Sequence, residues 1–583
     1  MSPSSQQQPA PAYAPEDDIN VDEKASGNSS PSPDQPRGTT GAVTVEGYVS
    51  DSQRRAQAGY YAFRWSSLYQ PAVVNPINGK SHTFPILRFW DTYSTQFWLA
   101  TLGFFVAFFG WFAAAALMTE AIKVDLKLTP AQVADSNLAS LGGTAFVRVI
   151  AGYAIDRYGP RKVMAILLCM GAIPTALMPV VHHLPSLKAI RFFISILGGT
   201  FVPCQSWTTT FFDKNIVGTA NAFSGGWGNM GGGVTPAVMI GLYERLRKSG
   251  YTQGMAWRLS FVVLPVPLLF VTAAVIMIFG KDHPAGKWSQ RHQLAGTAYE
   301  VAAGRAVHLD HNEVQEQERM RNQAGGENGG SNEKMLTSAA PVKGSDFSEL
   351  QPGQKYDQVD TAVSEPLTPR VAVQVLTDLR VWLCAVSYLL SFGLETAMDA
   401  ALPQLLFGLF GGPTFTAEDA AFAAATYGLL NLIFRPAGGV FADMLYSKYK
   451  PLGYGLRAKV MLMIVTNIMQ GLLMVGLGMY VNHSSHQSIG GVIGFIVGIA
   501  ATGFVANAGA YSVYSHLRPR NIGFVAGLVG SGGAVGGLCY TGLFKTQPGT
   551  KAARTLGNKF WIAGVVNIAG ILLFSWVPMG DAA

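Results

Sequence analysis

The chain has 583 residues and a formal net charge of +7, but only 13% of its residues are charged while 49% are hydrophobic. This charged share is about half of that in soluble globular domains, which is too little to cover a water-facing surface. The composition excludes an ordinary soluble protein and predicts an integral membrane protein in a lipid bilayer. The net positive charge of such a protein is no evidence for nucleic acid as a partner.

The apolar residues gather in twelve segments, each near or above the roughly 18 to 20 residues that cross a bilayer as a helix. We therefore predict an all-α polytopic membrane protein with twelve transmembrane helices. The predicted spans are 97–119, 133–155, 163–181, 189–212, 216–242, 259–280, 381–406, 420–446, 458–481, 489–514, 522–545 and 560–578.

Two long polar segments divide the chain into four parts. Residues 1–90 start with a Pro-, Ser- and Gln-rich stretch that is no signal peptide, so we predict a cytosolic region, largely disordered at its start. Its aromatic end, 63–91, is predicted to pack on the membrane part. Residues 91–280 and 376–583 then form two six-helix halves, joined by a largely disordered cytosolic linker at 281–375. Both termini are predicted to be cytosolic.

Basic residues support this orientation only in part. The loops after the second and eighth spans are basic, and they include Arg157, Arg161 and Lys459. Arg245 and Lys545, however, fall on predicted outer loops. The orientation therefore rests mainly on the long polar segments, which are hard to translocate without a signal.

A repeat relates the two halves. The second span contains "RVIAGYAID" and the eighth contains "RPAGGVFAD", and both follow the pattern R-x-x-x-G-x-x-x-D. Residues four apart share one face of a helix, so each trio forms a stripe. The trios are Arg148, Gly152 and Asp156, and Arg435, Gly439 and Asp443. Such related halves are typical of transporters built from repeats.

Glycine-rich segments also repeat, as "GGWGNMGGGV" at 225–234 and "AGLVGSGGAV" at 526–535. Gly226, Gly228 and Gly231 match the dinucleotide spacing G-x-G-x-x-G, but the flanking sequence is one apolar span without a strand pattern. We predict that most of these glycines let another helix approach closely. Their thin helix surface also leaves room for a small substrate, with Asn229 as the polar group facing it.

The two repeated arginines are predicted to lie deep in the membrane. Arg148 and Arg435 each stand eight residues before an aspartate at the end of the span, or roughly 12 Å into a core about 30 Å thick. Neither guanidinium can lose its charge, so each must meet an anion or line a wet cavity. Internal ion pairs are one alternative, with Glu395 and Asp399 as the remaining acids. Two cations at equivalent positions favour a small planar oxyanion between the halves.

The seventh span adds a stripe at positions i, i+4, i+7 and i+11, formed by Tyr388, Phe392, Glu395 and Asp399. The phenol can donate to an anion, and the phenyl ring can separate it from water. Glu395 is a candidate proton carrier, since desolvation favours the neutral form of a carboxyl group. Alternatively, Glu395 is a structural residue satisfied by a neighbouring helix or by water.

The inner ends of the two Arg spans are predicted to act as gates. In "GYAIDRYGPRK", Asp156 is expected to form a charge cluster with Arg157 and Arg161 that breaks as the halves move. Asp443 is the equivalent residue of the second half. The second segment lacks the following R-x-G-R-K, so the gating is expected to be asymmetric.

The sequence offers no chemistry for catalysis. The spans contain neither a nucleophile–base set nor a metal-ligand cluster, so we expect no enzyme, no metal and no cofactor. All four cysteines fall within apolar spans, where we expect buried thiols rather than disulfides.

Two of these motifs resemble a known family. "GYAIDRYGPRK" is similar to the conserved loop of the major facilitator superfamily, and "FVPCQSWTTTFFDKNIVGTANAFSGGWGNMGGGVTP" closely resembles the signature of its nitrate/nitrite porter family. The resemblance covers both halves, roughly 85–280 and 375–578. The long insert between the sixth and seventh spans, with a short C-terminal tail, resembles the fungal high-affinity branch.

This resemblance implies a twelve-helix major facilitator fold and alternating access. It also implies that nitrate binds between Arg148 and Arg435. The family's asparagine in the first glycine signature matches Asn229, and its Tyr-x-x-x-Phe-Gly matches Tyr388, Phe392 and Gly393. The backbones of Gly228, Gly231 and Gly530 are expected to complete the site.

We therefore predict a proton-coupled transporter that imports nitrate, and also nitrite, across the plasma membrane without an accessory subunit. One alternative is nitrate/nitrite exchange without protons. Another is a nitrate receptor that signals through its cytosolic segments with little transport.

Overall fold

The computed structural model describes residues 63–74, 79–291, 366–484, 487–545 and 553–579. It also describes two strands, β1 (Val43–Thr44) and β2 (His308–Leu309), which pair in a two-stranded sheet. The predictions of disorder at the start of the chain and in most of the linker 281–375 lie outside the described residues.

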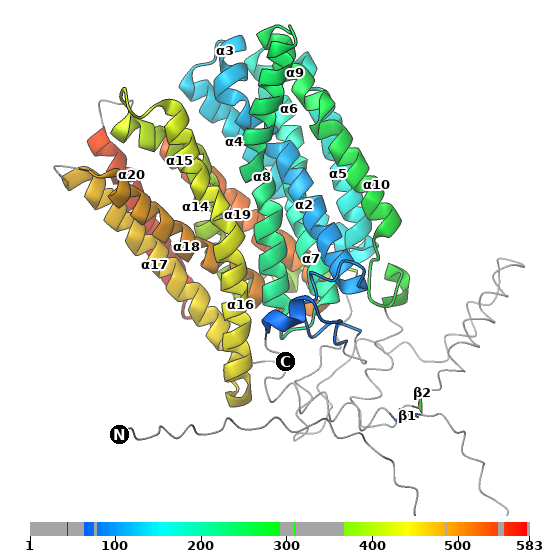
Figure 1. The fold of residues 1–583 in the computed structure, drawn as a ribbon. Coiled ribbons are helices and arrows are strands. Elements are labelled where there is room, and N and C mark those ends of the chain that lie inside the picture. The colour runs from blue at the N-terminus through cyan, green and yellow to red at the C-terminus, as the bar shows by residue number, and fades with distance from the viewer. Residues whose placement is uncertain are drawn as a thin grey trace, which may run out of the picture. The chain divides into compact units, whose positions relative to one another are not determined.

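The helices follow the predicted spans, although several spans consist of two helices in sequence (Figure 1). The first half contains α2 (Thr92–Ala116), α3 (Lys123–Asp125), α4 (Pro130–Tyr158), α5 (Pro160–Ala176), α6 (Leu184–Ile194), α7 (Phe201–Phe211), α8 (Val217–Lys248), α9 (Gln253–Val263) and α10 (Pro265–Phe279). The second half contains α13 (Pro369–Leu376), α14 (Leu379–Phe410), α15 (Ala417–Leu429), α16 (Asn431–Tyr449), α17 (Gly455–His483), α18 (Ile489–Tyr514), α19 (Ile522–Lys545) and α20 (Ala553–Phe574).

Among the described residues, ten helical segments are long and apolar enough to cross a membrane. The two predicted spans that are not among them are α8 and the pair α15–α16. The first contains the glycine segment with Asn229, and the second is interrupted at Leu430 and contains Arg435. Polar residues and glycines lower the hydropathy of both, yet both are helical, so the all-α fold is confirmed.

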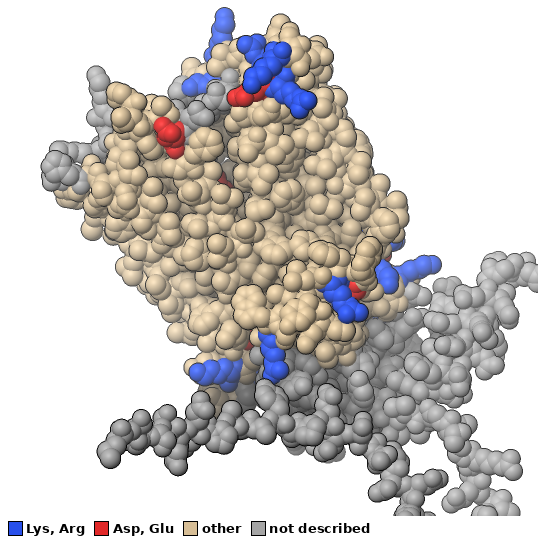
Figure 2. Space-filling view, in the orientation of Figure 1, with Lys and Arg blue, Asp and Glu red and all other residues tan. Residues whose placement is uncertain are grey.

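Charged side chains are distributed as a bilayer requires. On the face shown in Figure 2, nearly all Lys, Arg, Asp and Glu side chains lie at the two ends of the helices, and the band between them is uncharged. Such a band suits the hydrocarbon layer, because an unpaired charge there is costly. The chain is therefore a multi-pass membrane protein.

The described residues of the aromatic segment, 63–74 and 79–91, pack on one end of the helices (Figure 1), as predicted. The amide of Ser81 donates to the carbonyl of Phe211 at 2.9 Å, and the amide of Asp213 donates back to the carbonyl of Ser81 at 2.9 Å. Phe84 is fully buried against Phe97 and other rings. We call this end, where α7 ends and α8 begins, the inner end. The sequence predicts that it is cytosolic.

The two most extensive helix pairs between the halves each contain one of the repeated arginine helices. Helix α4 packs along α19, and α8 packs along α16. Glycines bring the backbones together in both pairs. A Cβ atom on Gly152 would meet the carbonyl of Gly523, and one on Gly439 would meet the carbonyl of Gly218. In both pairs the glycine of the repeated R-x-x-x-G-x-x-x-D stripe permits this close approach.

Two glycines of the first signature pack within their own half. A Cβ atom on Gly228 would overlap the ring of Phe104, and one on Gly231 would overlap the carbonyl of Phe105. Both neighbours belong to α2. The structure thus gives Gly228 and Gly231 a packing role on α2, and the expected contact of their backbones with substrate stays a prediction.

We predict that Gly231→Ala lowers the thermal unfolding temperature of the purified protein. A methyl group would press against the backbone of α2, and overpacking typically costs about 1–3 kcal/mol. Gly233→Ala is the matched control, because a Cβ atom there has no neighbour within 4 Å. Equal unfolding temperatures for the two variants would contradict the packing role of Gly231.

Candidate functional site

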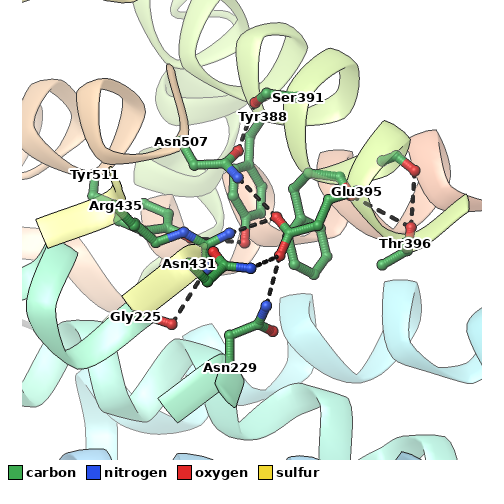
Figure 3. A network of polar contacts seen from close by, with 12 residues as sticks. Gly225, Asn229, Tyr388, Ser391, Glu395, Thr396, Asn431, Arg435, Asn507 and Tyr511 are labelled. Atoms are coloured by element: carbon green, nitrogen blue, oxygen red, sulfur yellow. Dashed lines mark hydrogen bonds and ion pairs between the residues drawn. The ribbon is translucent and has the colours of Figure 1, made fainter. Parts of the chain in front are cut away.

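A buried carboxylate, Glu395 of α14, forms the centre of a polar network between the halves (Figure 3). The Nη2 of Arg435 donates to Glu395 Oε2 at 2.5 Å, and both side chains are only 1% exposed. Asn507 donates to the same oxygen at 2.9 Å. Asn229 and Asn431 donate to Oε1 at 2.6 and 2.7 Å. The ion-pair alternative is therefore realised for Arg435, and the expectation that only a substrate anion faces this arginine needs correction.

Each donor is held in place by its own helix. Asn431 lies one turn before Arg435 on α16, so both side chains reach the same carboxylate. Ser391, one turn before Glu395, donates to Asn507 Oδ1 at 2.6 Å and orients that amide. Four donors, one of them cationic, suit an ionised carboxylate, which only accepts hydrogen bonds. The network thus supplies the hydrogen-bond donors that an ionised Glu395 requires.

Arg148 differs from Arg435, because its guanidinium meets carbonyl groups and rings. Its Nε donates to the carbonyl of Gly198 at 2.9 Å, and its Nη1 donates to that of Gly530 at 2.5 Å. Its Nη2 is buried and has no hydrogen-bond partner among the described residues. The guanidinium carbon lies 5.0 Å from the ring centre of Phe201 and 5.2 Å from that of Phe392. A buried cation with an unused donor is typical of a binding site that awaits an anion.

An aromatic cluster joins the two arginines. Tyr388 stacks on Phe392 at 4.8 Å and on Phe201 at 5.5 Å between ring centres. The hydroxyl of Tyr511 donates to that of Tyr388 at 3.0 Å. The guanidinium of Arg435 lies 5.8 Å from the ring centre of Tyr511. The cluster thus contacts Arg148 through Phe201 and Phe392, and Arg435 through Tyr511.

Asp156 and Asp443 close the inner end of the molecule. Asp156 accepts hydrogen bonds from the amides of Gly523 and Phe524, at 2.9 and 3.0 Å, where α19 begins. Asp443 accepts one from the amide of Thr219, at 2.5 Å, where α8 begins. Each carboxylate therefore binds the N-terminus of a helix in the opposite half, where free amides and the helix dipole favour an anion.

The loop arginines contact residues of their own half, and their expected charge cluster with Asp156 stays a prediction. Arg161 forms an ion pair with Asp282 at 3.3 Å and donates to the carbonyl of Gly280 at 2.9 Å. Arg157 is exposed and approaches the hydroxyl of Tyr153 at 3.5 Å. Burial raises the pKa of Asp282 above its ordinary value, although the neighbouring Arg161 acts in the opposite direction.

The cation beside Asp443 is Lys459, which the sequence placed in a basic loop. Lys459 lies in the first turns of α17, and its Nζ contacts Asp443 Oδ1 at 2.8 Å. Both side chains are 0% exposed. The sequence around a lysine near the start of a span does not show whether its side chain forms a buried ion pair or lies in an exposed loop. Here the partner comes from another helix.

Comparisons with known proteins agree with this architecture. The family profile described as the Major Facilitator Superfamily matches residues 100–541. Nitrate transporter 2.1 of Chlamydomonas reinhardtii is 27% identical over 86% of this chain and 78% of its own. High-affinity nitrate transporter 2.3 of Oryza sativa subsp. japonica is 26% identical over 84% of this chain and 80% of its own. The probable nitrate/nitrite antiporter NarK1 of Thermus thermophilus is 24% identical over 77% of this chain and 83% of its own.

The solved structure of the proton:xylose symporter XylE bound to 6-bromo-6-deoxy-D-glucose superposes with a TM-score of 0.55. It is 14% identical and covers 84% of this chain and 96% of its own, so this likeness concerns the fold alone.

The chain therefore belongs to the major facilitator superfamily, and it is a membrane transporter rather than an enzyme. Its relatives also confirm the predicted membership of the nitrate/nitrite porter family. The fungal branch stays a prediction.

Sequence reasoning missed the amides and rings that complete the site. Asn431 was open to prediction, because it precedes Arg435 by one helical turn. Asn507, Phe201 and Tyr511 lie in apolar spans without a distinguishing spacing. Only the packing of α7 and α18 on α14 and α4 brings them to the arginines.

We predict that Lys459→Met destabilises the protein strongly, by about 3–5 kcal/mol, since it leaves Asp443 as a buried charge without its cation. The double variant Lys459→Met with Asp443→Asn should lose less than the sum of the two single variants. Thermal unfolding in detergent measures these differences.

The control is Lys545→Met, which removes a partly exposed partner of Asp135 and should change the stability little. Strictly additive losses in the Lys459 and Asp443 variants would show that the two side chains do not stabilise one another.

Proposed function

We propose that this protein imports nitrate, and also nitrite, by alternating access coupled to protons. The observation that carries this proposal is the buried guanidinium of Arg148. Its Nη2 has no hydrogen-bond partner among the described residues, and it faces an aromatic cluster that Arg435 shares from the opposite half. An anion bound there touches both halves at once, as alternating access requires.

The chemistry of the site favours a small planar oxyanion. A guanidinium offers donors in a fixed fork that matches two oxygens of such an anion, and aromatic rings exclude water around it. The names of the relatives, which are nitrate transporters and a nitrate/nitrite antiporter, support nitrate and nitrite as the substrates.

Several residues complete the proposed binding site. Arg148 binds the anion first, and Tyr388 donates its hydroxyl hydrogen, which the bond from Tyr511 leaves unused. Phe392 shields the anion, while Gly530 positions Arg148 through its carbonyl group. Asn229, which bonds Glu395 in this structure, turns to the anion once that carboxylate is neutral.

Proton coupling follows from competition for Arg435. The Nη2 of Arg435 is occupied by Glu395, so a substrate anion and the ionised carboxylate compete for the same cation. Protonation of Glu395 removes its charge and frees Arg435 for the anion. Proton binding and anion binding therefore favour one another, and by linkage the effect is reciprocal.

The inner gate consists of the two aspartate–helix contacts. Because Asp156 and Asp443 join opposite halves at the inner end, both contacts must separate before an anion can leave there. The buried Lys459 forms an ion pair with Asp443 and so stabilises the contact that this aspartate makes with α8. We place the protein in the plasma membrane with both termini in the cytosol, and we assign it no accessory subunit.

Nitrate/nitrite exchange without protons is the second candidate, favoured by the name of the Thermus relative. Exchange of two monovalent anions moves no protons, whereas symport moves at least one proton with each anion. Nitrate-driven proton uptake into proteoliposomes distinguishes the two, and rapid nitrate/nitrite exchange without proton uptake would favour the exchanger.

We predict that Arg148→Lys and Arg435→Lys each raise the KM for nitrate about tenfold or more, which corresponds to about 1.4 kcal/mol. Lysine keeps the charge but loses the forked geometry. The measurement is the initial rate of labelled nitrate uptake, normalised to the amount of protein in the membrane. Arg157→Lys is the control, since that side chain is exposed at the inner end. A KM near the wild-type value in Arg148→Lys or Arg435→Lys would contradict direct contact between that arginine and nitrate.

We predict that Glu395→Gln abolishes the pH dependence of uptake. In the wild type, lower external pH protonates Glu395 and should raise the rate of uptake. Glutamine mimics the neutral acid at every pH, so the variant should still exchange labelled nitrate but should no longer move protons with it. Proton movement is followed with a pH-sensitive dye in proteoliposomes. Unchanged proton coupling would exclude Glu395 as the coupling residue.

A further inference from the structure

Asp399 is an acid in the membrane part to which the proposed mechanism gives no role. It lies one helical turn beyond Glu395 on α14, on the same face and toward the outer end. Its side chain is exposed, whereas Ala397, Met398 and Leu402 around it are 0–1% exposed. An exposed carboxyl group among buried neighbours marks a point where solvent reaches deep into the helices.

The face that bears Asp399 is turned to the space between the halves. Glu395, one turn earlier on this face, bonds Asn229 of α8 in the opposite half. A carboxylate turned to lipid would be costly at this depth. Figure 2 shows a hollow on this side, between the lobe that contains α15 and the lobe that contains α8. The exposure of Asp399 is therefore best explained by water that enters from the outer end.

The surroundings of Asp399 contain few ionisable groups. The charges that act on it are those of Glu395 on its own helix and of Arg435 on α16. Helix α15 contributes Tyr427, which faces both carboxyl groups, and α18 contributes Tyr511, which acts on Glu395. On α19, Lys545 at the outer end bonds Asp135 instead. A proton that reaches this region therefore meets two carboxyl groups.

We propose that Asp399 relays protons from the outer solution to Glu395. The inference rests on the proposed function and specifies the route of its proton. Glu395 itself is 1% exposed, and its four donors surround it, so a proton needs an intermediate acceptor that water can reach. Chains of Asp and Glu side chains form such relays in pumps and transporters.

The relay has two steps that conserve protons. Hydronium at the outer side protonates the Asp399 carboxylate. The acid then passes its proton to the Glu395 carboxylate, which becomes neutral and releases Arg435, while Asp399 returns to its ionised form. Asp399 follows Glu395 by four residues, which corresponds to a rise of about 6 Å along the helix axis. One water molecule bridges the two carboxyl groups in the proposed relay.

The test compares Asp399→Asn with the wild type in proteoliposomes. We expect the rate of nitrate-driven proton uptake at external pH 7 to fall about tenfold or more. The rate of exchange of labelled nitrate in the absence of a pH gradient should stay within about twofold of the wild-type rate, because exchange needs no net proton transfer. The expected tenfold fall in proton uptake corresponds to about 1.4 kcal/mol in the barrier. Asp399→Glu should restore proton uptake, since it keeps a carboxyl group at this position.

Glu244→Gln is the matched control, because it removes an exposed acid from α8 without a change near Glu395. Proton uptake of Asp399→Asn equal to that of the control would overturn the relay. Loss of nitrate exchange together with proton uptake would also overturn it, because Asp399 would then act on the anion. If the wild type itself moves no protons with nitrate, the proposed coupling fails, and this result is distinct from failure of the relay alone.

Discussion

The structure depends on the constraint that two guanidinium groups are buried at the middle of a membrane protein. A permanent cation in this environment requires a counter-charge, and the two halves solve the problem differently. Arg435 has an internal partner in Glu395, supported by three asparagine amides. Arg148 has carbonyl groups and aromatic rings instead, and one of its donors is unused. The pseudo-symmetric repeat therefore contains an asymmetric charge distribution, in which one arginine pairs with an acid and the other with carbonyl groups.

The same repeat builds the contacts between the halves. In each trio the aspartate binds the first amides of a helix in the opposite half, the glycine lets the two backbones meet, and the arginine donates to a carbonyl across the interface. One stripe of a helix thus carries both the arginine of the proposed anion site and the aspartate of the proposed gate. Because the three residues lie on one helix, the proposed mechanism connects occupancy of the site with closure of the inner end.

The two spans of low hydropathy lie where the halves meet. Helices α8 and α16 have too low a hydropathy to resemble ordinary spans, yet they form one of the most extensive helix pairs between the halves. Glycine and asparagine in α8 and the break at Leu430 reduce the apolar surface that these helices offer to lipid. Most of the uncharged polar residues and glycines lie on the buried faces of these helices, and this position permits residues that a lipid-facing surface excludes.

The sequence by itself determined the twelve helical spans, the repeat and the depth of both arginines, because these follow from hydropathy and from the periodicity of a helix. It also brought Glu395 into consideration, since few acids lie in the spans. Only the tertiary structure decided that Glu395 pairs with Arg435, that Lys459 is buried on Asp443, and that Gly228 and Gly231 pack on α2. These contacts join residues far apart in the chain, so their distances depend on how the helices pack.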